Sequence, residues 1–359
     1  MTRSPDNPWL HRFAVLTAVS TLALIGIGGL VTSHGAGLAV PDWPTSYGYN
    51  MFLFPPSYWV GGILYEHTHR LFASFVGLLT TVLAVWLWIK EPRRWLRWAG
   101  VFAFFGVVFQ GVLGGLRVTL LENSLGIVHA AIAQLFVVLV SLIALWTSRG
   151  RALAGASRGE GVVVSKGLLR LMVFGTLLIF LQLILGATMR HQHAGLAVPD
   201  FPLAYGKLWP AMDPASIEAY NRNRLDVFDP NPITAFQIGL HMIHRLGAFA
   251  CLVLVGLAAW FSRARLGSQS TQAKLCMLWF VLVVAQAGLG AATVLSNKAA
   301  DIATAHVVLG AASLVMGAIL WAMGLPVAAP ATQETECRAR ADGIPAISSG
   351  EPKAALSPN

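Results

Sequence analysis

Charged residues are scarce in this chain of 359 residues: Asp, Glu, Lys and Arg make up only 11%, whereas hydrophobic residues make up 56%. A soluble domain carries roughly 25% charged residues, so the composition excludes an ordinary soluble protein and indicates a membrane protein. Cysteines are also few, and Cys251, Cys276 and Cys337 predict no disulfide framework. The formal charge of +9 gathers in loops, so we interpret it as a topological signal and not as a nucleic-acid-binding surface.

The sequence consists mainly of long apolar runs. Eight uncharged or nearly uncharged runs are long enough to cross about 30 Å of hydrocarbon as helices. They are Phe13–Val31, Leu71–Ile89, Trp98–Leu116, Ser124–Thr147, Leu171–Met189, Leu246–Ser262, Leu275–Asn297 and Ile302–Leu325. The sixth run is short, and we expect its helix to begin earlier, near Phe236, so that it includes His241, His244 and Arg245.

Lys and Arg cluster in the loops on one side of these spans, whereas the loop from Gly35 to Glu66 has neither. The positive-inside rule therefore predicts that both termini are cytoplasmic. The first apolar run is longer than the roughly 7–15 residues of a signal-peptide core. The N-terminus also lacks the Arg- and Ser-rich character of a mitochondrial transit peptide. We expect a bacterial inner membrane protein.

A duplication spans most of the chain. The hexapeptide Gly-Leu-Ala-Val-Pro-Asp occurs at Gly37–Asp42 and again at Gly195–Asp200, 158 positions later. Three further landmarks recur at spacings of 175, 176 and 177: His69-Arg70 with His244-Arg245, Gln110 with Gln286, and His129 with His306. Each half then contains four spans, so the halves share one orientation.

The predicted fold is thus an all-α integral membrane protein whose eight transmembrane helices form two parallel-repeated four-helix bundles. The predicted boundaries are a cytoplasmic N-terminus (1–12), a first bundle (13–148), a basic cytoplasmic linker (149–170), a second bundle (171–325) and a disordered cytoplasmic tail (326–359). Segments rich in Gly and Ala within the spans are explained by close helix packing alone.

Four histidines occupy matched places in this register: His69 and His129 in the first half, His244 and His306 in the second. All four lie near the outer ends of helices that run in the same direction. In an up-down-up-down bundle the second and fourth helices are diagonal, so each pair faces across a core. Opposed imidazoles can hold a planar macrocycle through its metal. The alternatives are histidines satisfied by backbone or Ser/Thr groups, and a single four-histidine Zn or Cu site, which the separation of the bundles disfavours.

One position breaks the symmetry. Glu66 lies three residues before His69, and His241 takes that place before His244. Residues three apart share a helix face, so Glu66 is expected to project toward the site of His69, unless it only pairs with Arg70. Arg70 and Arg245 are candidates for pairing with carboxylates of a ligand, because a guanidinium binds a carboxylate through two hydrogen bonds.

Together, the duplicated halves, Glu-x-x-His-Arg at the second span and the lone histidines of the fourth and eighth spans resemble the heme A synthase family, over residues 10–325. The resemblance implies oxidation of a ring methyl of heme O to a formyl group by successive hydroxylations. It implies that His69 and His129 hold the substrate heme, that Glu66 is the essential carboxylate, and that His244 and His306 bind heme b. The loops before the second and sixth spans lack the cysteine pair of some members.

The partners that the resemblance implies are a heme O synthase, oxidase assembly factors, or a second copy of the chain. It implies no nucleic-acid partner, and it implies heme sites toward the outer face. A different function also fits paired histidines in bundles, namely a di-heme electron carrier linked to quinol, without chemistry on its heme. A transporter is disfavoured because the ionisable residues collect near one end of the spans.

Overall fold

The structure, a computed structural model, describes residues 7–148, 164–224 and 231–325 of the chain. Its helices are α1 (Pro8–Ser33), α2 (Gly61–Lys90), α3 (Arg94–Leu120), α4 (Asn123–Trp146), α6 (Lys166–His191), α7 (Pro214–Arg222), α8 (Ala235–Leu266), α9 (Thr271–Leu295) and α10 (Ala300–Gly324), with short 3₁₀ turns η1 (Met51–Leu53), η2 (Pro56–Tyr58) and η4 (Ala194–Leu196). Within these ranges eight helices, all except α7, are long and apolar enough to cross a membrane. The predicted all-α fold with eight spans is confirmed.

Four of the spanning helices, α1, α6, α8 and α9, start with a side-chain cap. The Asn7 side chain accepts hydrogen bonds from the first turn of α1, and Ser165 and Ser270 do the same for α6 and α9. At α8, Thr234 and Gln237 form a reciprocal capping box. This fixes the start of α8 one residue before the predicted Phe236, because the four free N–H groups of a helix start need acceptors.

The second span begins much earlier than its apolar run predicts, at Gly61 instead of Leu71. The intervening residues include the polar run from Glu66 to Arg70, which lowers their hydropathy, but the preceding loop supplies partners for Glu66 and Arg70. Glu66 accepts a hydrogen bond from the Val40 N–H, and Arg70 donates to loop carbonyls. Polar groups with such partners can extend a helix into a region that water does not reach.

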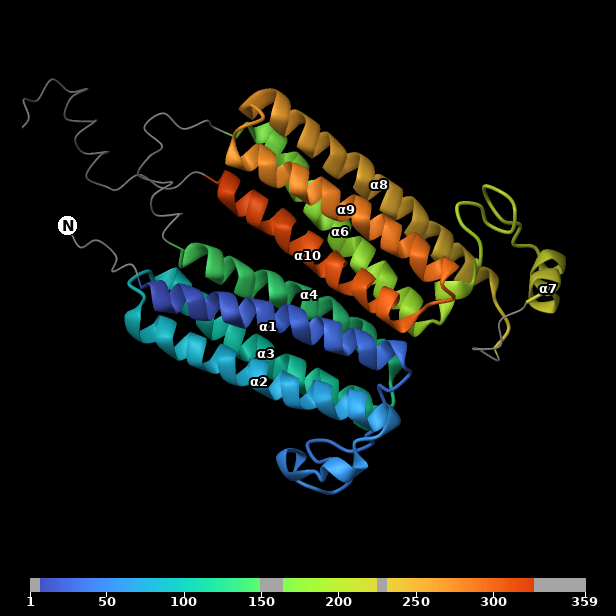
Figure 1. The fold of residues 1–359 in the computed structure, drawn as a ribbon, viewed down its shortest axis with the longest axis horizontal. Helices are drawn as coiled ribbons and strands as arrows, with labels where there is room; N and C mark the ends of the chain where they lie inside the picture. Colours follow the sequence, from blue (N-terminus) through green and yellow to red (C-terminus); the bar gives the residue numbers. More distant parts are fainter. Residues whose placement is uncertain (1–6, 149–163, 225–230, 326–359) are drawn as a thin grey trace, which may run out of the picture.

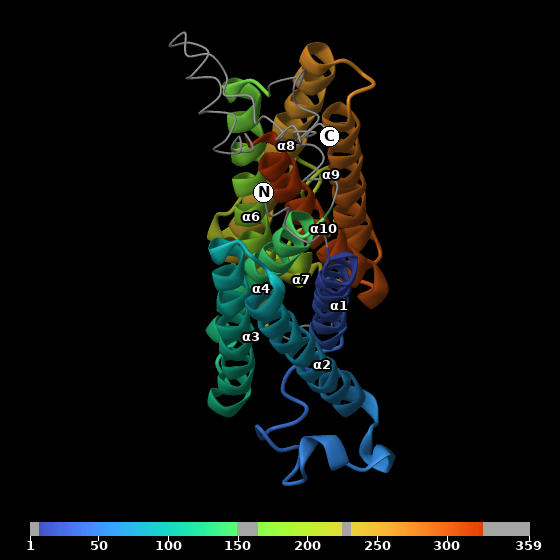
Figure 2. The same cartoon turned by 90° about the vertical axis from the view of Figure 1, so that its left-hand side faces the viewer.

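Two four-helix bundles lie side by side (Figures 1 and 2). In the first, α1 contacts α2, α2 contacts α3, α3 contacts α4, and α4 closes the ring on α1. In the second, α6, α8, α9 and α10 follow each other in the same way. The diagonal pairs are therefore α2 with α4 and α8 with α10. The bundles meet through α1 with α10, α4 with α6, and α4 with α10.

Each bundle has its own apolar core. The first is built around Leu83, Leu87 and Ile143, which are fully buried. The second surrounds Trp279, whose indole N–H donates to the Ser313 carbonyl at 2.8 Å. Glycines on the facing helices leave the space that this ring fills: a Cβ at Gly175 would lie 2.8 Å from Trp279 Cη2. Small residues thus set the spacing of the helices here.

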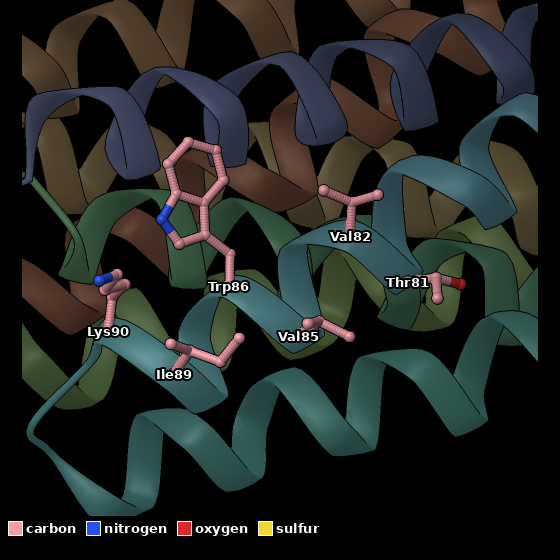
Figure 3. Close-up of a pocket in the computed structure, with 6 residues that line it drawn as sticks. All are labelled: Thr81, Val82, Val85, Trp86, Ile89 and Lys90. Atoms are coloured by element: carbon pink, nitrogen blue, oxygen red, sulfur yellow. The ribbon is translucent and has the colours of Figure 1, made fainter.

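The loops at one end of the bundles, residues 34–60 and 192–234, are much longer than those at the other end (Figure 1). We call this the loop end. A shallow apolar pocket of about 340 Å³ lies near the opposite end of α2 and is lined by Thr81, Val82, Val85, Trp86, Ile89 and Lys90 (Figure 3). It has no titratable group except Lys90 and is remote along α2 from His69.

Some predicted segments lie outside the described residues: 1–6 of the N-terminus, 149–163 of the basic linker, and the tail 326–359 with Cys337. The other two cysteines, Cys251 and Cys276, are buried free thiols.

Gly175→Ala is expected to destabilise the protein by about 1–3 kcal/mol, the usual effect of overpacking a core, because its methyl group meets the fully buried Trp279. Gly167→Ala in the same helix is the matched control, since a Cβ there meets no described heavy atom within 4 Å. Thermal unfolding in detergent measures both. Equal melting temperatures for the two variants would contradict this account of the core.

Candidate functional site

The four duplicated histidines lie within the first three turns of their helices, on the side of the loop end. His69 on α2 and His129 on α4 belong to one diagonal pair of helices, and His244 on α8 and His306 on α10 belong to the other. All four are half-buried. The imidazole rings of His244 and His306 lie 6.5 Å apart between centroids, with their planes inclined by 68°.

That separation suits a metal between the two rings. Imidazole nitrogens lie about 2 Å from a bound metal ion, which puts the centres of two opposed rings about 6 Å apart. In the first bundle His69 and His129 are also close enough to interact electrostatically. Among the described residues, no group of three or more His, Cys, Asp or Glu side chains could hold a metal ion. The arrangement therefore offers two imidazole pairs, one in each bundle.

Each site histidine faces a glycine on a neighbouring helix. A Cβ at that glycine would lie 3.1–3.5 Å from the imidazole ring; the pairs are Gly28 with His69, Gly114 with His129, Gly186 with His244 and Gly290 with His306. These glycines are themselves in duplicated register, 158 and 176 positions apart. The sequence suggests only helix packing for them. Their contacts show a second role, which is to leave room for the rings.

Hydrogen bonds orient the rings of the second pair. His306 Nδ1 lies 3.1 Å from the Gln286 carbonyl, which can only accept, so Nδ1 carries the proton and Nε2 keeps its lone pair. A neighbouring acceptor of this kind is typical of metal-binding imidazoles. The Gln182 amide nitrogen lies 3.0 Å from His244 Nδ1 and donates to the His244 carbonyl at 2.7 Å. Sequence reasoning missed Gln182, since the first half has Leu24 at the equivalent place.

Polar atoms without partners gather around these rings. Among the described residues, the buried side-chain atoms that lack a hydrogen bond include Nδ1 of His129 and Oε1 of Gln110, Gln182 and Gln286. Each of these glutamines contacts a site histidine. Buried polar groups are normally satisfied, so the concentration of unsatisfied ones beside two imidazole pairs fits sites that a ligand completes.

Glu66 and Arg70 are held by the loop that precedes them. The Glu66 carboxylate is 4% exposed, accepts from the Val40 N–H at 2.8 Å and forms an ion pair with Arg70 at 2.8 Å. Arg70 also donates to the carbonyls of Val40, Asp42 and Thr45. The pairing considered for Glu66 is thus present, and both terminal nitrogens of Arg70 are engaged.

The second half repeats this clamp. Arg245 donates to the carbonyls of Val198, Asp200 and Leu203, the counterparts of the three carbonyls that Arg70 holds. No carboxylate takes part, because His241 replaces Glu66 and its Nδ1 lies 3.2 Å from the Ala194 carbonyl. Both arginines thus fasten the hexapeptide loops over the ends of the bundles. A role toward a ligand's carboxylate stays a prediction for each.

The aspartate of the hexapeptide explains why the motif recurs. Asp42 accepts from the N–H groups of Tyr47 and Gly48, and Asp200 from those of Tyr205 and Gly206, all with positive φ. Burial alone would raise the pKa of Asp42, but hydrogen bonds from the Gly48 N–H, the Thr45 hydroxyl and the Tyr47 N–H outweigh it and lower that pKa. An aspartate thus closes each turn.

The remaining histidines have other surroundings. His67 is fully buried against Ser46, Phe54 and Trp59. His34 stacks on Tyr65 with ring centroids 4.0 Å apart. His191, at the end of α6, fills the space over Gly126 of α4 and so reaches into the other bundle.

Known proteins match this chain over most of its length. A sequence model of the family described as cytochrome oxidase assembly protein, COX15-CtaA, matches residues 60–319. The heme A synthase of Shouchella clausii (strain KSM-K16) is 29% identical and covers 81% of this chain and 88% of that protein. The heme A synthase of Methylorubrum populi is 28% identical, and the match covers 92% of this chain and 90% of that protein. The heme A synthase of Shewanella oneidensis is 26% identical, and the match covers 83% of this chain and 90% of that protein.

The matched residues run from the start of α2 into α10 and include Glu66 and both imidazole pairs. The chain is a multi-pass membrane protein, and it belongs to the COX15-CtaA family of cytochrome oxidase assembly proteins.

Proposed function

We propose that this protein is a heme A synthase, an oxidoreductase that converts the ring methyl of heme O into the formyl group of heme A. The observation that carries the proposal is that, of the two imidazole pairs, only the first has a glutamate three residues before its first histidine: Glu66 precedes His69, whereas His241 precedes His244. Heme A synthase relatives that cover most of the chain support it. A simple electron carrier would need no such difference between its two sites.

The first bundle is the substrate site in this proposal. His69 and His129 hold heme O, and Gly28 and Gly114 leave room beside their rings. Each hydroxylation takes an oxygen atom from water and releases two electrons and two protons to acceptors. Glu66 is the group we expect to take a proton, or to act on the activated methyl carbon. Its ion pair with Arg70 fixes it in place.

The second bundle holds the resident cofactor. We propose that His244 and His306 bind heme b, with the Gln286 carbonyl fixing the tautomer of His306. When bound, heme b supplies one-electron transfer at this site. Gln182, whose amide nitrogen contacts both Nδ1 and the carbonyl of His244, has no counterpart in the substrate site.

We also propose the orientation. Basic residues collect at the end opposite the loop end, so that end faces the cytoplasm of a bacterium, together with both termini. The heme sites then lie toward the outer face of the inner membrane. A heme O synthase that supplies the substrate, and oxidase assembly factors that receive the product, are the proposed partners.

Glu66→Gln is expected to keep heme O bound but to lower its conversion by about 100-fold or more, because a lost acid–base group costs that much. Glutamine retains an acceptor oxygen for Val40 or Arg70, so the loop stays in place. The measurement is mass analysis of extracted hemes after co-expression with a heme O synthase. Glu91→Gln, at the far end of α2, is the control for a buried carboxylate paired with arginine.

Wild-type protein that yields no heme A in this experiment would defeat the proposed function. Bound heme without conversion in the wild type would favour the di-heme carrier instead. Full conversion of heme O by Glu66→Gln would contradict the role proposed for Glu66 but not the proposed function.

His244→Ala is expected to abolish the heme b signal of the second bundle while heme O binding in the first persists. The reason is that a bis-imidazole site loses one of its two axial ligands. Heme content per chain and the reduced-minus-oxidised spectrum measure this. His34→Ala, which removes a ring stacked on Tyr65, is the control and leaves the spectrum unchanged. An unaltered spectrum in His244→Ala would overturn the assignment.

Single cysteines introduced on a Cys337→Ser background test the orientation. Ser57→Cys in η2 and Ser268→Cys between α8 and α9 are both exposed, at opposite ends of the bundles. A maleimide that cannot cross membranes is expected to label Ser57→Cys in intact cells, and Ser268→Cys only after lysis. The reverse labelling pattern would invert the topology.

A further inference from the structure

Arg117, near the end of α3, has a side chain that no described residue pairs with closely. Its Nε is buried and makes no hydrogen bond. The nearest carboxylate, Glu66, is instead ion-paired with Arg70 at 2.8 Å. Arg117 is half-buried, and a partly buried cation without an anion is costly, so a cation placed this way indicates that an anionic ligand completes the site.

Its surroundings place it at the first imidazole pair. Gly114 lies three residues earlier on the same face of α3 and meets the ring of His129. The charge of Arg117 acts on Glu66, His69 and His129. The position of Arg117 one turn beyond Gly114, together with these charge interactions, puts the guanidinium near the first imidazole pair.

The hexapeptide loop makes room for this side chain. A Cβ at Gly37 would lie 2.6 Å from Nη2 and 2.7 Å from Nη1 of Arg117, so only glycine allows the guanidinium to lie there. At the neighbouring Gly115, the Trp43 ring of the same loop takes the space of a side chain. The loop therefore both covers the end of α3 and leaves the guanidinium its place under that cover.

The second half has no arginine at the equivalent position, and the side chain over Gly195, the counterpart of Gly37, is that of Lys298. Thr293, 176 positions later, stands where Arg117 would be, and its hydroxyl donates to the Leu289 carbonyl at 2.8 Å. Arg190 of α6 is also a half-buried arginine, but it donates to the Gly29 carbonyl and the Ser33 hydroxyl of α1. Arg70 and Arg245 are occupied by the loop carbonyls. Arg117 is thus a feature of the first site.

We infer that Arg117 is the residue that binds a carboxylate side chain of the substrate macrocycle, and so positions heme O in the first bundle. The inference rests on the proposed function and deepens it. Heme O carries two propionate groups, and a guanidinium can hold a carboxylate through two parallel N–H···O bonds. Binding would supply the anion that Arg117 lacks and would fix the rotation of the macrocycle about the axis of its two imidazoles.

The test compares heme O with its dimethyl ester, in which both carboxylates are blocked, by spectral titration of purified protein. The wild type is expected to bind heme O about 10- to 100-fold more tightly than the ester, the usual contribution of a charged hydrogen-bonded pair. In Arg117→Gln this ratio is expected to fall by about 10-fold or more, mainly through weaker binding of heme O. Arg94→Gln removes the same charge at the other end of α3 and is expected to keep the wild-type ratio.

Gly37→Ala is a second variant that keeps Arg117 but takes its space, and it is expected to lower the ratio in the same direction. Size-exclusion elution and the melting temperature report whether Arg117→Gln folds. If it does not fold, the affinity ratio of Gly37→Ala tests the inference in its place. An unchanged ratio in the folded variants would overturn the inference while leaving the proposed function intact, provided that the wild type converts heme O. A wild type that neither binds nor converts heme O would overturn both.

Discussion

Polar side chains inside a membrane must find partners within the protein, and the site depends on how this chain meets that constraint. Arg70 and Arg245 meet it by holding the carbonyls of the hexapeptide loops. His306 and Gln286 meet it by bonding across two helices. Among the described residues, several groups that remain unsatisfied belong to residues of the imidazole pairs or to glutamines that contact them, whereas others, such as Ser262 Oγ, lie elsewhere. A ligand that coordinates the rings and carries a carboxylate would supply a metal for the imidazoles and an acceptor for Arg117 Nε, so the same constraint that shapes the helices also bears on the choice of ligand.

The duplication separates scaffold from chemistry. Features that recur are structural: an aspartate that closes each turn, an arginine that clamps each loop, and a glycine opposite each ring. Two of the features that do not recur lie at the sites. Glu66 gives way to His241, and Arg117 gives way to Thr293. Under the proposed function, two equivalent bis-imidazole frames became a substrate site and an electron-transfer site through a few substitutions that left the frames unchanged.

Much of this could be predicted from residues. The eight spans, the diagonal placement of the histidines and the early start of α8 all follow from hydropathy and from constant register. The start of α2 could not be predicted, because its polar turns are stabilised by a loop whose path hydropathy does not describe. Nor could the partners of Arg70, which depend on carbonyl directions about 30 residues away in the chain. Gly28 and Gly186 carried a signal in their shared register, but only the contacts distinguish room for a ring from ordinary packing.

The interface between the bundles bears on how such a chain could arise. Its helix pairs, α1 with α10 and α6 with α4, are equivalent under the repeat, as in a symmetric dimer of half-length chains. Yet the two sides differ. Arg190 of α6 donates to α1, whereas the residue equivalent to Arg190 in the first half is Thr32. His191 fills the space over Gly126 of α4, whereas the residue equivalent to His191 is Ser33. Two identical subunits would carry the same residue on both sides. Fusion of the genes is therefore what allowed the two seams, and with them the two sites, to diverge.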